Sequence, residues 1–383
     1  MTYDYLIAGA GAAGLSLLTY LLEEPALADK QILLIDRDQK RTNDRTWCFW
    51  QEADGPFESV VLRKWDHLYF HSPKMDKLMN ISPYSYKMIR GLDFYAYCFE
   101  LIADHPNVTF IQDEIRSMED NRVICENGTY EARLIFNSAQ YKINPKPHQH
   151  FLKQHFKGWF LKTEKPSFVV DEPVLMDFRV KQVDGCSFVY VLPLSETEAL
   201  VEYTLFSPTV LEQPVYDDLL RDYIDQYLQL EEYTIEEEEF GVIPMTNAHL
   251  PMRKGAHIVN IGTAGGYSKP STGYTFTFIQ KFVQTIVQNL ATGHDPLFGL
   301  EGSRAKYHFY DSVLLRVLKE RELEAWRVFD AMFANLPEWM VLRFLDEDTH
   351  FGQEILVMNS VPLWTFLKAA LTELPTALFA ERS

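Results

Sequence analysis

Residues 5–18 read YLIAGAGAAGLSLL, and this stretch decides how the rest of the chain is interpreted. An apolar segment runs into the pattern G-x-G-x-x-G and then into a helical pattern, which is the fingerprint of a dinucleotide-binding strand, turn and helix. The glycines permit a tight turn and a close approach to a pyrophosphate, and the helix N-terminus offers free N–H groups. We therefore expect a dinucleotide to be bound by Gly9, Ala10, Gly11, Ala13 and Gly14.

A second apolar segment, residues 31–35, ends in Asp36. Asp36 follows Gly14 at about the 20-residue spacing of the acid that binds a ribose hydroxyl. No basic cluster precedes Asp36, which favours FAD or NAD over NADP. Because the fingerprint begins at residue 5, the pattern favours a flavoprotein over a NAD domain placed later in a chain.

Composition and charge exclude several classes of partner. The 383 residues are 47% hydrophobic, enough for a full core divided among two or three structural units. A net charge of −18 argues against nucleic acid and against docking on anionic lipid by charge alone. Any contact with a membrane surface is therefore expected to be hydrophobic.

The four cysteines are widely spaced and form no C-x-x-C pair, so we expect no metal site formed by them. This use of cysteine favours the reducing cytoplasm as the compartment of the protein. The first strand begins too early for a signal peptide to precede it, and no apolar run has membrane-spanning length. These features predict a cytoplasmic protein that is soluble or peripheral to the membrane.

The first part of the chain alternates strands with a helix. The patterns predict strands at 65–70 and 108–111, an extended segment at 80–90, a helix at 91–104, a hairpin at 122–132 turning at Asn127-Gly128, and a strand at 134–136. This order is typical of hydroxylase-type flavoproteins. We expect residues 1–150 and 240–295 to form a Rossmann-type FAD-binding domain.

Strand patterns then dominate residues 151–239, at 159–162, 174–180, 188–192 and 199–206. They predict an antiparallel sheet that covers the flavin and forms a substrate pocket. A helix is expected at about 215–230. The acidic run Glu236-Glu237-Glu238-Glu239 is interpreted as a solvated face or a strand edge.

The chain then returns to the cofactor. A buried strand at 257–261 leads into a second glycine-rich turn, and residues 269–273 precede a helix from Tyr274 to about Leu290. We expect this segment to make a second cofactor contact, the alternative being an ordinary βα turn. The expected contact residues are Gly262, Thr263, Gly265, Gly266, Thr272 and Gly273. Residues 296–383 are expected to be helical, and the apolar segment 361–378 either packs on the core or lies in a bilayer interface.

Together these motifs resemble the lycopene cyclase family, and most of all its bacterial beta-cyclases. The resemblance covers essentially the whole chain, in order, at residues 9–14, 45–49, 200–204, 264–274 and 342–346. The run ending in Pro-Ser-Thr-Gly-Tyr at residues 270–274 is the most specific of these segments. Arg45 is a cofactor contact on this resemblance.

The resemblance implies a flavoprotein without net redox chemistry. A carboxylic acid protonates a terminal double bond of lycopene, the cation closes to a six-membered ring, and proton loss gives a β-ionone ring, towards beta-carotene. In the family, reduced FAD stabilises the cation, and NAD(P)H keeps the FAD in its reduced form. Glu202 occupies the position of the proton donor, and the protein is expected on the inner face of the cytoplasmic membrane.

The residues around Glu202 bear on this role. An acid that protonates an alkene near neutral pH needs an apolar pocket that raises its pKa, and Val201, Tyr203, Leu205 and Phe206 are candidates to supply one. The alternative is a strand glutamate that faces solvent. Two positions depart from related patterns. Tyr203 stands where family members often have a second acid, and Thr263 stands where flavin hydroxylases have Asp.

Two other functions remain open on this fold. One is an FAD- and NAD(P)H-dependent isoprenoid reductase or aromatic hydroxylase, which consumes reductant and changes product mass. The other is a carotenoid-binding or membrane-tethering flavoprotein without catalytic activity.

Overall fold

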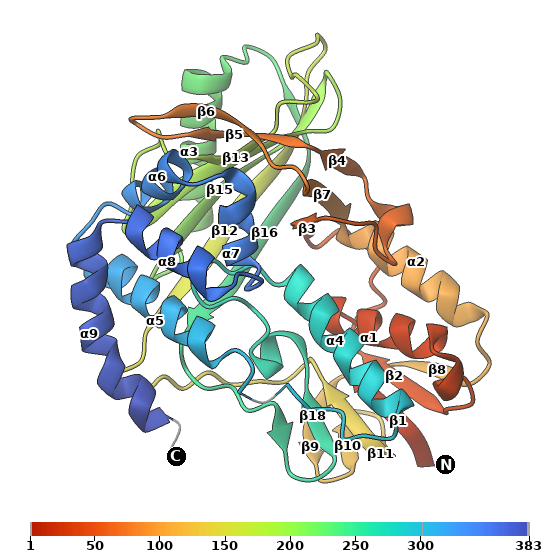
Figure 1. Ribbon diagram of the computed structural model, residues 1–383. Helices are drawn as coiled ribbons and strands as arrows, with labels where there is room; N and C mark the ends of the chain where they lie inside the picture. The colour runs from red at the N-terminus through yellow and green to blue at the C-terminus, as the bar shows by residue number, and fades with distance from the viewer. Residues whose placement is uncertain (1, 301, 381–383) are drawn as a thin grey trace.

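The chain is described in a computed structural model at residues 2–300 and 302–380 (Figure 1). A parallel sheet in the order β18-β11-β1-β2-β8 forms its N-terminal half, with β17 at one edge. The strands are β1 (Thr2–Ala8), β2 (Ile32–Asp36), β8 (Val108–Gln112), β11 (Thr129–Asn137), β17 (Arg253–Lys254) and β18 (Ile258–Asn260). Most of β1 and β2 is buried, because both faces of the sheet are covered.

Helices cover one face of this sheet and a hairpin covers the other. Ile7 and Leu34 pack towards α1 (Ala12–Glu23), α2 (Gly91–Ala103) and α4 (Phe276–Ala291). Leu6 and Leu33, which alternate with them, pack against β9 (Ile115–Glu119) and β10 (Arg122–Cys125). This alternation explains why the strands have no polar face.

The second large sheet has the order β16-β12-β15-β14-β13-β5-β6 and is antiparallel except for the pair β13–β5. Its strands are β5 (His67–His71), β6 (Asp76–Asn80), β12 (Phe151–Lys162), β13 (Val174–Asp177), β14 (Cys186–Pro193), β15 (Glu198–Ser207) and β16 (Thr234–Thr246). A small third sheet has the order β3 (Thr46–Gln51), β7 (Ser85–Arg90) and β4 (Arg63–Trp65). Between β4 and β7 the chain forms β5 and β6 of the second large sheet.

Helices also cover both faces of the second sheet. Val201 and Tyr203 pack with α3 (Gln213–Tyr223) and the π-helical turn η3 (Ile224–Leu228). The opposite face contributes Phe188 and Leu200 to a core shared with the C-terminal helices (Figure 1, blue). These are α5 (Ala305–Glu320), α6 (Trp326–Asn335), α7 (Glu338–Leu345), α8 (Phe351–Ser360) and α9 (Leu363–Ala380).

The structure changes several predicted elements. The strand predicted at 65–70 is two strands in different sheets, because the chain leaves the small sheet at Asp66 and enters the large one. The strand predicted at 134–136 is the end of β11, which continues from the hairpin without a break. Residues 240–246, which we expected in the FAD-binding domain, belong to β16 and pair with β12. Of the apolar segment 361–378, residues 375–378 lie outside the described side chains.

Candidate active site

The fingerprint residues form the turn between β1 and α1. Gly9 has a φ of +108°, and a Cβ at Gly14 would collide with the carbonyl oxygen of Gly9. Both positions therefore require glycine. Gly11 is the N-cap of α1 without a side-chain cap, and no described residue approaches within 4 Å of where its Cβ would lie. The first N–H groups of α1 therefore have no side-chain cap, and there is free space beside Gly11.

Asp36 lies beside this turn at the end of β2. Its Oδ2 accepts a hydrogen bond from the N–H of Ala10 at 2.6 Å, and its Oδ1 accepts one from Asp38 at 2.8 Å. Because β1 and β2 are parallel neighbours, their carboxyl ends bring Gly9 and Asp36 to the same edge of the sheet. The structure therefore brings together the first group of predicted cofactor residues.

The second glycine-rich turn packs directly on the first. Gly262 has a φ of +60°, and a Cβ there would lie 2.6 Å from the Cβ of Ala13. Gly262, Thr263 and Gly265 form the 3-10 turn η4 (Gly262–Gly265), and Gly266 ends it with a φ of +80°. Residues some 250 positions apart in sequence are thus in contact.

A tight turn at 269–274 precedes α4. The N–H of Gly273 donates to the carbonyl of Lys269 at 2.8 Å, and the N–H of Lys269 donates to the carbonyl of Tyr274 at 2.8 Å. This turn delays the helix, so α4 begins at Phe276 and not at the predicted Tyr274. Thr272 is buried, and its Oγ1 has no hydrogen-bond partner among the described residues.

These features fit a dinucleotide. The open N-terminus of α1 suits a pyrophosphate, and Asp36 is placed for a ribose. A buried oxygen, Gln154 Oε1, also lacks a donor in the described part of the chain and lines the adjoining cavity. An unpaired buried oxygen of this kind is expected where a ligand supplies the partner.

The adjoining cavity has a volume of about 350 Å³ and joins the predicted cofactor residues to Glu202. Arg45, Thr263 and Gly273 line it on one side, and Glu202 on β15 lines it on another. Its wall contains the aromatic residues Trp47, Tyr86, Tyr141, Phe156, Tyr190, Phe240, Tyr274 and Phe276. A carboxyl group surrounded by ring faces suits chemistry that passes through a cation.

A second carboxyl group, Glu239 on β16, lines the same cavity. Both Glu202 and Glu239 stand opposite Gly158 of the intervening strand β12, so they share one row and one face of the sheet. Gly158 has no side chain between them, and a Cβ there would lie 3.0 Å from Glu239 Cγ. The sequence interpretation missed Glu239, because the whole acidic run was assigned to a solvated face or a strand edge. β16 is an edge strand, as that alternative has it, but Glu239 is buried.

Burial dominates the electrostatics of both acids. Burial, and then the charge of Glu239, raise the pKa of Glu202 well above its usual range, against a hydrogen bond from Thr204 at 2.9 Å. Burial also raises the pKa of Glu239, opposed by a hydrogen bond from Thr46 at 2.7 Å. Burial and the neighbouring charge therefore both favour the protonated form of Glu202, the form that a general acid needs.

The apolar surroundings of Glu202 differ from those expected. Val201, Tyr203 and Leu205 point to the opposite face of the sheet and pack towards α3. The hydroxyl of Tyr203 donates to the carbonyl of Lys181 at 2.8 Å. Neighbouring positions of a strand face opposite sides, so the cavity wall comes instead from other strands, through Leu192 and Tyr190, and from Leu200 two positions away.

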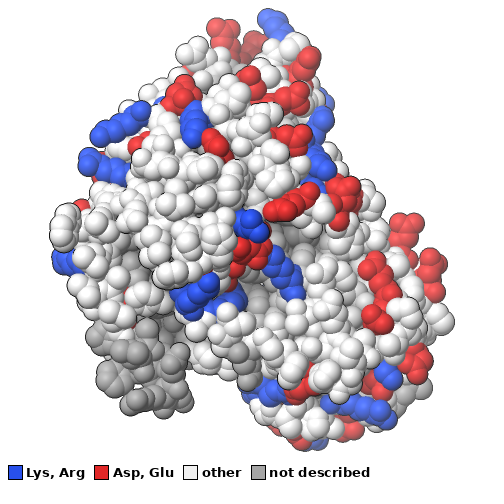
Figure 2. Space-filling view, viewed as in Figure 1, with Lys and Arg blue, Asp and Glu red and all other residues white. Residues whose placement is uncertain are grey.

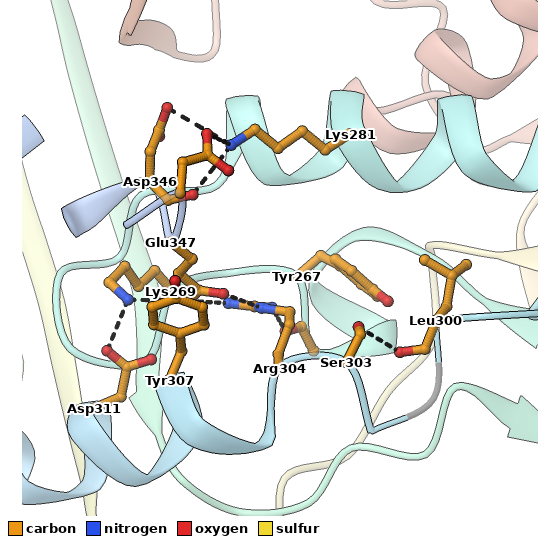
Figure 3. Close-up of polar contacts among 12 residues, drawn as sticks. Tyr267, Lys269, Lys281, Leu300, Ser303, Arg304, Tyr307, Asp311, Asp346 and Glu347 are labelled. Atoms are coloured by element: carbon orange, nitrogen blue, oxygen red, sulfur yellow. Dashed lines mark hydrogen bonds and ion pairs between the residues drawn. The ribbon is translucent and has the colours of Figure 1, made fainter. Parts of the chain in front are cut away.

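A buried ion network anchors the turn at 269–274 to the C-terminal helices (Figure 3). Lys269 Nζ lies 2.9 Å from Asp311 Oδ1 on α5 and 3.0 Å from Glu347 Oε1 after α7. Arg304 makes two hydrogen bonds of 2.7 Å to Glu347. Although burial alone would raise it, hydrogen bonds from Arg304 and the charge of Lys269 lower the pKa of Glu347 to about 2. The network thus fixes the backbone of the Gly273 turn.

A larger cavity of about 530 Å³, also lined by Phe276, lies among α4, residues 49–61 and the C-terminal end of α7 with the residues after it. Lys281, Arg343, Asp346 and Asp348 line it, and charges of both signs surround the hollow in the middle of Figure 2. Burial raises the pKa of Asp346 to about 7. This cavity contains neither Glu202 nor Glu239, so it is separate from the acid pair.

Comparison with known proteins adds the family. A lycopene beta-cyclase of Pseudescherichia vulneris is 25% identical over 97% of this chain and 98% of its own length. A lycopene beta-cyclase of Paracoccus sp. (strain N81106 / MBIC 01143) is 27% identical over 78% of this chain and 77% of its own. The name lycopene beta-cyclase is that of the two relatives.

Solved structures confirm the predicted fold class. The flavin-dependent brominase Bmp2 superposes with a TM-score of 0.60 at 11% identity, covering 100% of both chains. A geranylgeranyl bacteriochlorophyll reductase-like protein of Thermoplasma acidophilum gives 0.56 at 14%, covering 99% of this chain and 98% of its own. The chain therefore has the mixed α/β, Rossmann-type fold of flavin enzymes with a helical C-terminal region.

The family model described as lycopene cyclase protein matches residues 4–371, nearly the whole chain. This match confirms the resemblance seen in the motifs. The chain belongs to the lycopene cyclase family.

Proposed function

We propose that this protein is an FAD-dependent lycopene beta-cyclase, which converts the acyclic ends of lycopene into β-ionone rings. The observation that carries the proposal is the position of Glu202, an acid with a raised pKa in an aromatic cavity that Thr263 and Gly273 also line. Family membership and the names of the relatives support the choice of substrate.

In the proposed reaction, the carboxylic acid of Glu202 transfers its proton to the terminal double bond of one end of the polyene. The resulting cation is attacked by a second double bond of the same chain, which closes a six-membered ring. Loss of a proton from the ring then leaves an isomer of the substrate. The aromatic rings of Tyr190 and Tyr274 in the cavity wall stabilise the cation.

The two glycine turns would hold FAD, with Gly9, Ala10, Gly11, Ala13 and Gly14 at the pyrophosphate and Asp36 at the ribose. Arg45, Gly262, Thr263, Gly265, Gly266, Thr272 and Gly273 would complete the site on the cavity side. When bound in its reduced form, maintained by NAD(P)H, FAD supplies negative charge that stabilises the cation.

Product mass and reductant consumption test the proposal. Purified protein is incubated without oxygen with lycopene in liposomes, FAD and NADPH, and the products are separated by chromatography. We expect a product of unchanged mass with a blue-shifted spectrum, formed without stoichiometric loss of NADPH. A mass changed by hydrogen or oxygen, with NADPH consumed in step, would identify a reductase or hydroxylase. Binding without any product would leave a carotenoid-binding protein.

We also propose that the protein is cytoplasmic and meets its lipid-soluble substrate at the inner face of the cytoplasmic membrane. The contact surface is the outer face of α8 and α9, where Phe351 is 72%, Trp364 80% and Leu371 60% exposed. Ile355, Leu356, Met358, Leu363, Leu367 and Leu374 extend it. Uncharged side chains cover α8 in Figure 2. No helix within the described ranges is long and apolar enough to cross a membrane.

Replacing Trp364 and Leu371 together by Ser is expected to weaken partition onto neutral liposomes by about several hundredfold, because each side chain contributes roughly 2 kcal/mol when it leaves water, or roughly 4 kcal/mol for the two. The wild-type partition should change little with salt. Liposome flotation measures both. The control is Val169→Ser, because Val169 is 60% exposed and lies between β12 and β13. Binding that requires anionic lipid and disappears at modest salt would contradict this surface.

A further inference from the structure

We propose that Glu202 and Glu239 act as one carboxyl pair that shares a single proton, gives it to the substrate and takes it back at the end of the reaction. This inference rests on the proposed function and assigns the second acid of the site.

The sheet places the two acids together through Gly158. Glu202 and Glu239 lie two strands apart, each directly opposite Gly158 of β12. Any larger residue at 158 would intrude between them, since its Cβ would lie 3.0 Å from Glu239 Cγ, 3.3 Å from Glu239 Oε1 and 2.9 Å from Leu200 Cδ1. On the same face of β12, the bulky residues Phe156 and Phe160 stand two positions before and after this gap. The gap therefore allows two glutamate side chains to lie over one glycine.

An unpaired oxygen points to the shared proton. Glu239 Oε2 accepts from Thr46, whereas the buried Glu239 Oε1 has no donor among the residues described. Glu202 interacts with Glu239 and becomes a donor when it is protonated. A proton held by Glu202 towards Glu239 satisfies this oxygen, which would otherwise be costly to bury.

The surrounding groups favour one proton over two or none. Cys48 of β3, Tyr86 of β7, Tyr190 of β14 and Tyr274 face the pair, and burial raises the pKa of each, so all are neutral at pH 7. Arg45 and Thr46 favour the charged form of Glu239, while Glu237 opposes it. Two carboxylates so close together cannot both ionise easily. Glu239 is therefore the charged member and Glu202 the protonated one.

The proton balance closes within the pair. Proton transfer from Glu202 to a terminal alkene carbon forms a C–H bond and leaves two carboxylates beside the new cation, so the total charge is unchanged. Ring closure forms a C–C bond and moves the positive charge into the ring. A ring C–H bond then breaks, its electrons form the ring double bond, and the proton returns to the pair. No external acid or base is consumed.

The pair also explains why the site needs no acid at position 203, where this chain has Tyr203. A second acid at position 203 would point away from the cavity, because Tyr203 packs on the α3 side of the sheet. In this chain the second carboxyl group of the cavity comes from a different strand.

The test uses FAD-loaded protein and the variant Glu239→Gln. An infrared titration follows the carboxylic-acid band of Glu202, identified by its absence in Glu202→Gln. We expect the band to disappear at lower pH in Glu239→Gln than in the wild type, because the neighbouring negative charge is gone. The band of Asp346, whose pKa is about 7, should be unchanged in both variants. An unchanged midpoint for Glu202 would overturn the pair.

Kinetics give the second readout. In Glu239→Gln the alkaline limb of kcat should move to lower pH, and kcat at pH 8 should fall about tenfold or more, with little change in KM. Glu239→Asp keeps the charge and should restore part of the rate. Gly158→Ala, which displaces Glu239, should shift the limb in the same direction as Glu239→Gln. The control is Glu236→Gln, an exposed position on the same strand.

The two readouts separate the possible failures. Because the infrared titration needs no substrate, it tests the pair even if the wild type cyclises nothing, an outcome that would reject only the proposed function. A wild type that cyclises lycopene, together with a Glu239→Gln variant of unchanged kcat and pH profile, would reject the catalytic role of the pair.

Discussion

Replacement of Glu202 by Gln is expected to lower kcat by about 10²- to 10⁴-fold, the usual contribution of a general acid, while FAD remains bound. Gln has nearly the same shape and still accepts a hydrogen bond from Thr204, but its amide cannot donate a proton to an alkene. Initial rates of ring formation measure the loss, and flavin absorbance after gel filtration measures FAD retention.

The matched control for this experiment is Glu198→Gln. Glu198 begins the same strand, and its side chain is 42% exposed and paired with Lys162 at 3.0 Å. The control should retain full activity, because it lies outside the cavity lining. Normal ring formation by Glu202→Gln would refute the assignment of Glu202 as proton donor, and loss of FAD in that variant would show a structural effect instead.

The dinucleotide turn was predictable because its geometry is local. Gly9 and Gly14 are required by a turn of six residues, and the position of Asp36 follows from the pairing of two adjacent parallel strands. The second turn, around Gly262, was recognised by the same local pattern. Its contact with Ala13 depends on the fold, however, and no spacing in the sequence indicates it.

The acid pair was not predictable in the same way. In the sequence, Glu239 cannot be distinguished from the other glutamates of the run at 236–239. Its side chain lines the cavity because of the register in which β16 pairs with β12. The sequence contained one signal, the glycine at 158 within the bulky run 156–160 of a strand. A glycine in the interior of a strand often marks a position where another group approaches the backbone closely. Strand alternation likewise excluded Val201 and Tyr203 as neighbours of the Glu202 side chain.

The strongest effect on stability is expected from Lys269→Met. Its removal takes away the cation that lies between Asp311 and Glu347. Glu347 keeps Arg304, whereas Asp311 keeps the hydrogen bond from Ser271, and breaking a buried ion pair of this kind costs about 3–5 kcal/mol. The Lys269 ammonium also ties the turn that carries Thr272 and Gly273 to Asp311 and Glu347, so FAD affinity should fall as well. Chemical unfolding measures the change in free energy, and flavin fluorescence measures FAD binding.

The pH dependence of this effect has a defined sign. Because the pKa of Glu347 is lowered to about 2, its ionised form stabilises the fold above its ordinary pKa of 4.5, and this contribution is lost as pH falls towards 2. The difference between wild type and Lys269→Met should therefore be largest above about pH 5 and shrink in acid. The control, Lys281→Met, removes a lysine whose side chain is 42% exposed and should cost at most about 1 kcal/mol. Equal losses for the two variants would show that the buried network does not hold the turn.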